Sequence, residues 1–255
     1  MKKSIFALSF LMLIAGITYS QSADEVISKY FESIGGLDNW KNLKSLKLTG
    51  KVPTPQGEFS FALYKKAPDM MLTELDIQGK RLVPQAYDGE IAWTINPFMG
   101  SEDAQKLPEE STKELKNEAV FEDPFIDYAK KGHVVTLEGK ENVDGTECYA
   151  VKLIKNKNND KDEVTEIYYF DTEYYLPIKV KSYMLSGPTS GQEIETYMSN
   201  YEEIDGGLVM PFSLEVKMGG QTQNVITLEK IEVNPEINDD FFKFKEASEE
   251  TGDED

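Results

Sequence analysis

The sequence predicts a mainly β protein (α+β) in which one large antiparallel sheet curls under a few helices. Apolar and polar residues alternate along most of residues 46–233, as they do in strands that bury one face. Short turns that contain glycine separate these segments, and two stretches have helical instead of strand periodicity. About eleven strands with such short loops form an antiparallel sheet, and a sheet of that size curls or closes to avoid long open edges.

Residues 1–20 have the pattern of a secretory signal peptide. Lys2 and Lys3 precede an almost unbroken apolar run over residues 5–17, and small residues end the segment. The run is shorter than the ~20 residues that span a bilayer, which favours a cleaved signal over a membrane anchor. We expect cleavage after about Ser20 and export to the periplasm without a lipid anchor, because no cysteine follows the apolar run.

The chain is strongly acidic. Its 255 residues carry 46 Asp and Glu against 27 Lys and Arg, a net charge of −19, and removal of Lys2 and Lys3 would make this −21. Such a charge argues against nucleic acid and anionic lipid surfaces as partners, since both attract basic proteins. Cys148 is the only cysteine, so no intrachain disulfide can form, and its alternating apolar neighbours predict a small buried filler.

A helix is predicted over residues 23–33, at the start of the mature chain. Apolar residues recur there at helical spacing and form one stripe. Ser22 or Asp24 can cap its N-terminus, and Gly35 with Gly36 ends it. A second short helical piece follows, and this amphipathic unit needs an apolar surface to cover.

The alternating segments follow this helical unit and resume after a break in the middle of the chain. Gly79, Gly89 and Gly145 stand in tight turns that join neighbouring segments as hairpins. The expected strands cover residues 46–50, 59–63, 71–77, 82–87, 91–95, 135–141, 147–154, 164–171, 177–184, 193–201, 208–218 and 223–233.

Residues 101–131 break the alternation between the two halves of the sheet. Residues 109–117 are mostly helix formers, and residues 120–128 carry apolar positions of their own. We expect a helical insert here, of one or two helices, that covers one face of the sheet together with the N-terminal helix. Residues 21–245 then form a single domain, and the Glu- and Asp-rich residues 246–255 form a disordered acidic tail.

Residues that carry chemistry are scarce. His133 is the only histidine and Cys148 the only cysteine, which argues against a Ser-His-Asp or Cys-His arrangement and against a zinc site. Residues 156–162 space oxygen atoms faintly like a calcium loop but lack its glycine and its closing glutamate. We therefore expect no enzyme, no catalytic residue, no metal and no cofactor. A hydrolase built on two carboxylates stays open as an alternative, because 46 acidic residues make any pairing unspecific.

The apolar residues of the first hairpins are more informative. A curled sheet under helices can enclose apolar space, and soft methionine side chains adapt to flexible ligands. The alternative is an ordinary filled core, which the same periodicity would produce. For a hollow interior, we expect a ligand-binding lining that includes Phe59, Phe61, Leu63, Met71, Leu75, Trp93, Phe98 and Met99.

Several short motifs resemble the LolA/LolB-like family of exported lipoprotein carriers, and within it the outer-membrane lipoprotein-sorting proteins of Bacteroidetes-type bacteria. The motifs keep their order and spacing over nearly all of the mature chain. They are YFESIGGL at residues 30–37, LKSLKLTG at 43–50, YDGEIAW at 87–93, NPFMGS at 96–101, GKENVDG at 139–145, YFD at 169–171, LPI at 176–178, Tyr201 with GLVMP at 207–211, and IEVN at 231–234 with Phe241.

The resemblance implies an unclosed antiparallel β-barrel, with helices as a lid over an apolar cavity that shields lipoprotein acyl chains. It implies a periplasmic, non-enzymatic carrier or binder of a lipid or lipoprotein acyl chain, acting in outer-membrane lipoprotein sorting or a similar transport. We expect a monomer. The alternative function is an envelope protein-interaction module with a filled core, whose acidic surface docks a basic partner.

Overall fold

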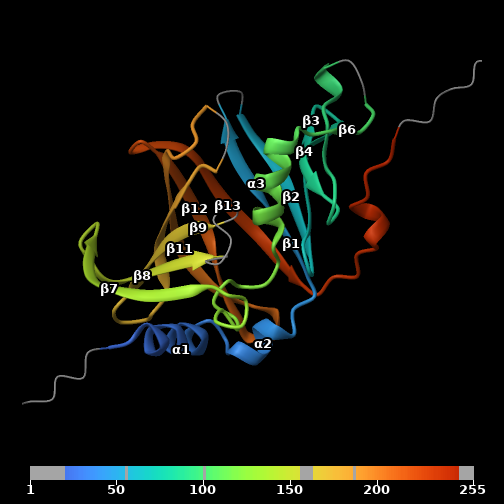
Figure 1. Cartoon of the computed structure of the whole chain (residues 1–255). Helices are drawn as coiled ribbons and strands as arrows, with labels where there is room; N and C mark the ends of the chain where they lie inside the picture. Colours follow the sequence, from blue (N-terminus) through green and yellow to red (C-terminus); the bar gives the residue numbers. More distant parts are fainter. Residues whose placement is uncertain (1–20, 55–56, 100–101, 156–162, 186–187, 247–255) are drawn as a thin grey trace, which may run out of the picture.

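Within the residues that the structure describes, one antiparallel sheet of thirteen strands makes up most of the molecule, and it curls without closing (Figure 1). The computed structural model describes residues 21–54, 57–99, 102–155, 163–185 and 188–246. The expected signal peptide, the loop at 156–162 and most of the expected acidic tail lie outside these residues. The prediction of a mainly β protein with a large, curled, unclosed antiparallel sheet is confirmed.

The sheet is a meander in which every strand but the outermost two pairs on both sides. Its strands are β1 (Ser45–Thr54), β2 (Gly57–Lys66), β3 (Met70–Ile77), β4 (Lys80–Tyr87), β5 (Ala92–Ile95), β6 (Gln105–Lys106), β7 (Val134–Val143), β8 (Thr146–Lys155), β9 (Val164–Asp171), β10 (Pro177–Tyr183), β11 (Glu193–Ile204), β12 (Leu208–Met218) and β13 (Gln221–Val233). Sequential strands are neighbours except for β6 and β7, and β1 also pairs with β13. The outermost strands are β6 and β7, which are not paired with each other in the described residues. The expected segments correspond to twelve of the thirteen strands, so the expected total of about eleven was too low. The strand that was not expected is β6, which has only two residues and shows no alternation.

Three α-helices accompany the sheet within the described residues. They are α1 (Ala23–Ser33), α2 (Leu37–Lys41) and α3 (Glu109–Ala119). Three short 3-10 turns occur at Pro97–Met99, Asp205–Gly207 and Asp239–Phe241. In Figure 1, α1 and α2 lie at one end of the curled sheet, and α3 lies inside the curl.

The N-terminal helix α1 forms where its sequence predicts. The Ser22 hydroxyl accepts a hydrogen bond from the backbone N–H of Glu25, whose carboxylate accepts one from the backbone N–H of Ser22. This capping box satisfies donors that the helix itself leaves unpaired. The apolar stripe of α1, which includes Tyr30, packs on the buried Val151 of β8 and Phe170 of β9.

The end of α1 lies against the turn that joins β11 and β12. Gly35 has a φ of +100°, and a Cβ atom added there would lie 2.1 Å from the carbonyl oxygen of Gly207. Next to it, the backbone N–H of Val209 donates to the Ile34 carbonyl at 3.1 Å. Glycine at position 35 is thus needed both for its backbone conformation and for this close approach.

The region for which the sequence predicts one or two helices contains one. This helix, α3, contacts β4 and β5, and its buried Leu115 packs against Met71. Residues 124–131 form turns instead of a second helix. Asp127 has a φ of +49° there, in the left-handed region, and a residue in that conformation interrupts a right-handed helix.

Strand register separates the sheet into an inner face, on which α3 lies, and an outer face. Residues directly opposed in a ladder share a face. Met71 opposes Tyr87, and both pack with α3, so they lie on the inner face. Leu72 therefore points to the outer face, where it packs with Val83 and Phe242. The C-terminal segment after β13 thus covers the outer face of β3 and β4, as its position in Figure 1 shows.

Candidate functional site

The inner face of the sheet is apolar beyond the part that α3 covers. Leu48 of β1 and Leu228 of β13 are buried in one cluster, against which Phe212 of β12 packs. Side chains two residues apart on a strand point the same way, so Leu214 shares this face with Phe212. The register agrees, because Leu214 opposes Ile226, which packs on the same cluster.

This inner face stays partly open to solvent along β11 and β12. Leu214 opposes Met198, and Ile194 opposes Met218, so apolar side chains meet across the two strands. All four are half-buried instead of buried, whereas Leu48 is only 8% exposed. An apolar surface that is both concave and accessible can bind an apolar ligand.

Five of the eight residues expected to line a cavity lie together on the inner face. Phe61 opposes Leu75, and Leu63 and Phe59 alternate with Phe61 along β2. Phe59, Phe61, Leu63 and Leu75 are half-buried, while Met71 is fully buried beneath α3. These residues continue the apolar surface of β11–β13 across β1.

The other three expected lining residues lie elsewhere. Trp93 opposes Ala86, and both belong to the outer-face cluster, where the indole N–H of Trp93 donates to the Phe242 carbonyl at 2.8 Å. Phe98 and Met99 occupy the 3-10 turn after β5 and are 53% and 81% exposed. Alternation along β5 shows that Trp93 and its sequence neighbours point to opposite faces of the sheet. It does not show which of the two faces is the inner one.

Trp93→Phe is expected to destabilise the protein without changing its ligand binding. The substitution leaves the buried Phe242 carbonyl without its indole partner, which costs about 1–2 kcal/mol. Urea unfolding gives the free-energy change, and titration with a fluorescent fatty acid gives the binding. A loss of binding at unchanged stability would contradict the assignment of Trp93 to the outer face.

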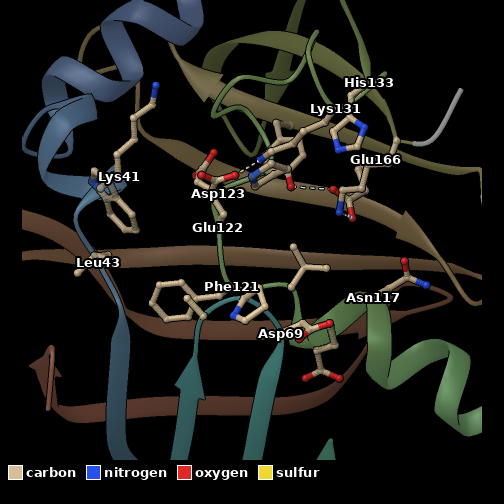
Figure 2. Close-up of a pocket in the computed structure, with 18 residues that line it drawn as sticks. Lys41, Leu43, Asp69, Asn117, Phe121, Glu122, Asp123, Lys131, His133 and Glu166 are labelled. Carbon is tan, nitrogen blue, oxygen red and sulfur yellow. Dashed lines mark hydrogen bonds and ion pairs between the residues drawn. The ribbon is translucent and has the colours of Figure 1, made fainter. Parts of the chain in front are cut away.

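A pocket of about 970 Å³ adjoins the apolar inner face at the end where α2 lies (Figure 2). Its apolar wall includes Leu43 and Phe121, which pack in the same cluster as Phe61 and Leu63. Its other walls come from the end of α3, the residues that follow it, and the start of β9. The pocket therefore joins an apolar surface to a group of charged side chains.

The polar wall of the pocket is a connected network. The Glu166 carboxylate accepts hydrogen bonds from the Lys155 ammonium and the Tyr168 hydroxyl, both at 2.7 Å. Burial and this carboxylate hold the pKa of Tyr168 well above its ordinary value. Burial, followed by the charges of Lys131 and Lys155, lowers the pKa of His133. At neutral pH, His133 is therefore neutral, and the lysines are the cations of this wall.

The carboxylate of the half-buried Asp123 ties α1 to the segment after α3. Asp123 accepts hydrogen bonds from the Tyr30 hydroxyl at 2.7 Å and from the backbone N–H of Phe125 at 2.9 Å. Burial raises the pKa of Asp123, and its hydrogen bonds and the charges of Lys131 and Lys155 only partly offset this. The network therefore holds a carboxylate whose ionisation opposes folding.

Asp123→Asn is expected to gain stability relative to the wild type as the pH rises. A carboxyl whose pKa is raised in the folded state favours folding most when protonated, and this contribution is lost as the pH rises through the folded pKa. Asparagine does not titrate, so its contribution to the free energy of unfolding does not change with pH. The contribution of Asp123 in the wild type falls as the pH rises. Urea unfolding of both proteins from about pH 4 to pH 7 measures the difference, which should move toward the variant. A difference that is independent of pH would contradict the raised pKa.

Sequence patterns did not indicate this pocket. The pocket takes its polar residues from separate segments that form no local motif, as Lys131, Lys155, Glu166 and Tyr168 show. The sequence around His133 predicts no binding role for it. Among the residues that the structure describes, no group of three or more His, Cys, Asp or Glu side chains could hold a metal ion. Within the same residues, no helix has the length and apolar character needed to cross a membrane.

Comparison of the sequence with known proteins gives one matching family model. A family model described as "Uncharacterized protein" matches residues 107–246, which is more than half of the chain. No curated protein matches the sequence.

Solved structures cover most of the chain at low sequence identity. A DUF1329 family protein from Desulfovibrio piger has a TM-score of 0.58 at 16% identity, over 88% of this chain and 98% of that chain. A LolA superfamily protein from Nitrosomonas europaea has a TM-score of 0.55 at 12% identity, over 88% and 98%. A domain described as an outer membrane lipoprotein-sorting protein, from Vibrio parahaemolyticus, has a TM-score of 0.53 at 12% identity, over 86% and 97%.

These identities are too low to transfer a function, but the shared architecture confirms the expected LolA-like fold. The TM-scores show that all three structures share the overall fold of this chain. The chain belongs to the family whose model, described as "Uncharacterized protein", matches residues 107–246, and its fold is similar to that of the LolA superfamily protein from Nitrosomonas europaea.

Proposed function

We propose that this protein is a periplasmic, non-enzymatic carrier or binder of a lipid or lipoprotein acyl chain. The observation that carries the proposal is the half-buried apolar surface on the inner face, formed by Leu214 and its neighbours on β11–β13 and by Phe61 and Leu75 on β2 and β3. A filled core would bury these side chains as completely as it buries Leu48.

The chemistry of acyl chains fits such a surface. Each methylene group that leaves water gains about 0.8 kcal/mol, so a long chain cannot cross an aqueous compartment without an apolar shelter. Half-buried Met198 and Met218 add flexible side chains that adapt to the shape of a chain.

The fold and the sequence support the same cellular setting. One relative of the same fold is described as an outer membrane lipoprotein-sorting protein, and another as a LolA superfamily protein. The signal-peptide pattern of residues 1–20 supports export to the periplasm. The acidic surface keeps a carrier with an apolar interior soluble and away from anionic membranes, and we expect it to act as a monomer.

Lipid analysis of the purified mature protein tests this function. We expect organic solvent to extract a bound lipid or fatty acid from periplasmically expressed protein, which mass spectrometry would identify. We also expect the emptied protein to bind a fluorescent fatty acid. Protein that is consistently empty and also ignores the fluorescent probe would overturn the proposal.

An envelope protein-interaction module is the second candidate function. The exposed side chains of Phe98 and Met99, next to each other in one turn, favour it, because adjacent exposed apolar residues often mark contact sites. Phe98→Ser with Met99→Ser should then abolish capture of an envelope partner in pull-downs while fatty-acid binding is unchanged. Loss of fatty-acid binding in this variant would instead place the turn at the lipid site.

A further inference from the structure

The pocket at the α2 end has one apolar wall and walls with charged side chains. An acyl chain alone would not require the charged walls. Leu43 and Phe121 continue the inner face into the pocket, so a chain lying on that face leads directly to it. Figure 2 shows Lys131, His133 and Glu166 on one side of the pocket and Asp69 on the other. One ligand that touches both regions is an amphiphile with its tail on the inner face and its polar end in the pocket.

The side near β8 and β9 offers two cations. Lys155 binds Glu166 at 2.7 Å, and Lys131 is paired with Glu122. A lysine ammonium has three donors, so each can hold its carboxylate partner and donate to a further oxygen as well. Both ammonium groups act on the same His133 imidazole and on the same Asp123 carboxyl, which places them around one part of the pocket.

The opposite side offers carboxylates. Asp69, in the turn between β2 and β3, and Glu118, near the end of α3, both line the pocket. A purely anionic headgroup would meet these carboxylates at close range, and it would also be repelled by a chain of net charge −19. A headgroup that carries both signs complements both sides of the pocket.

We propose that this pocket binds the headgroup of a zwitterionic lipid, with a phosphate ester against Lys131 and Lys155 and an amine toward Asp69. The inference rests on the proposed acyl-chain function and names its ligand class. The volume of about 970 Å³ holds such a headgroup together with the first part of the chain, since ligand pockets measure about 300–1,000 Å³.

Calorimetric titration with two probes of the same chain length tests the headgroup site. The first probe is a myristoyl lysophosphatidylethanolamine, and the second is a myristoyl monoglyceride, which has no phosphate and no amine. We expect the wild-type protein to bind the phospholipid about tenfold more tightly, the gain from roughly one charge-assisted contact. Equal affinity of the two probes would overturn the headgroup site and leave the acyl-chain function standing. If neither probe binds, the proposed function itself fails.

Variants then test the assigned residues. Lys131→Gln combined with Lys155→Gln should reduce the tenfold preference to less than about twofold while monoglyceride binding, which also reports correct folding, is retained. Lys130→Gln is the matched control, because Lys130 lies on the same turn but is paired with Asp127 outside the pocket. We also expect the wild-type protein to bind lysophosphatidylethanolamine more tightly than lysophosphatidic acid, which lacks the amine, and Asp69→Asn should remove this second preference. A preference that survives these changes would overturn the assignment.

A chain-free probe separates a lipid site from a site for soluble phosphate esters. Glycerophosphoethanolamine has the same headgroup without the acyl chain. We expect it to bind too weakly to compete with the lysophospholipid, because the tail supplies most of the affinity. Competition at equal concentration would show a phosphate-ester site independent of lipid and would overturn the proposal.

Discussion

Leu214→Asp is expected to weaken fatty-acid binding on the order of a hundredfold. The side chain lies half-buried on the inner face, between Met198 and Ile226 on the neighbouring strands. An acyl chain lying there would cover the new carboxylate and remove its water, and an unpaired buried charge costs several kcal/mol. Titration with a fluorescent fatty acid measures the loss directly.

Val225→Asp provides the matched control for this substitution. Val225 of β13 opposes Glu215 of β12, and Glu215 directly follows Leu214. Adjacent residues on a strand point to opposite faces, so the side chains of Glu215 and Val225 point to the outer face, where Val225 is 36% exposed. The control adds the same charge to the same part of the sheet and should leave binding unchanged. Equal losses in both variants would show that the inner face does not bind the chain.

Gly35→Ala is expected to destabilise the protein by about 3 kcal/mol or more. The methyl group would collide with the Gly207 carbonyl, which lies 2.1 Å from the position of the added Cβ. Either α1 or the β11–β12 turn must then move, and the buried contacts of α1 with β8 and β9 weaken. The φ of +100° adds roughly 1–2 kcal/mol of backbone strain. Thermal and urea unfolding measure the change.

Gly36→Ala separates strain from collision. Gly36 has a similar φ of +94°, but an added Cβ would meet no atom within 4 Å. We expect this variant to lose only the strain, about 1–2 kcal/mol. Similar losses in the two variants would mean that α1 does not press against the turn as closely as the geometry requires.

Local patterns predicted the parts of the fold that local interactions determine. The helix α1 has its cap, stripe and stop within residues 22–36, and the long hairpins carry both their alternation and their turns. The two-residue strand β6 and the turns at residues 124–131 escaped prediction. The first is too short for a period, and the second depends on a left-handed Asp127. The pairing of β1 with β13 joins strands that are far apart in the sequence, so no local window contains it.

The site was predicted in part for the same reason. Phe61, Leu63 and Leu75 stand out because alternation is strong in the first hairpins, and ladder register unites them. The equivalent residues of β11 and β12, such as Leu214, alternate equally well but gave no sign of being open to solvent. The charged wall of the pocket needed the fold, since Lys131, Lys155 and Asp69 are brought together only by the curl of the sheet.

Because β6 and β7 are not paired with each other in the described residues, the width of the interior of the curled sheet can change. In a closed barrel, strand number and stagger fix the circumference, so a wider interior requires a row of interstrand hydrogen bonds to break. In the part of the chain that the structure describes, the two outermost strands are not paired with each other, so each ladder from β6 to β7 can stay intact while the sheet bends more or less. Ligands of different width therefore require different curvatures of the sheet, but none of them requires backbone hydrogen bonds between strands to break.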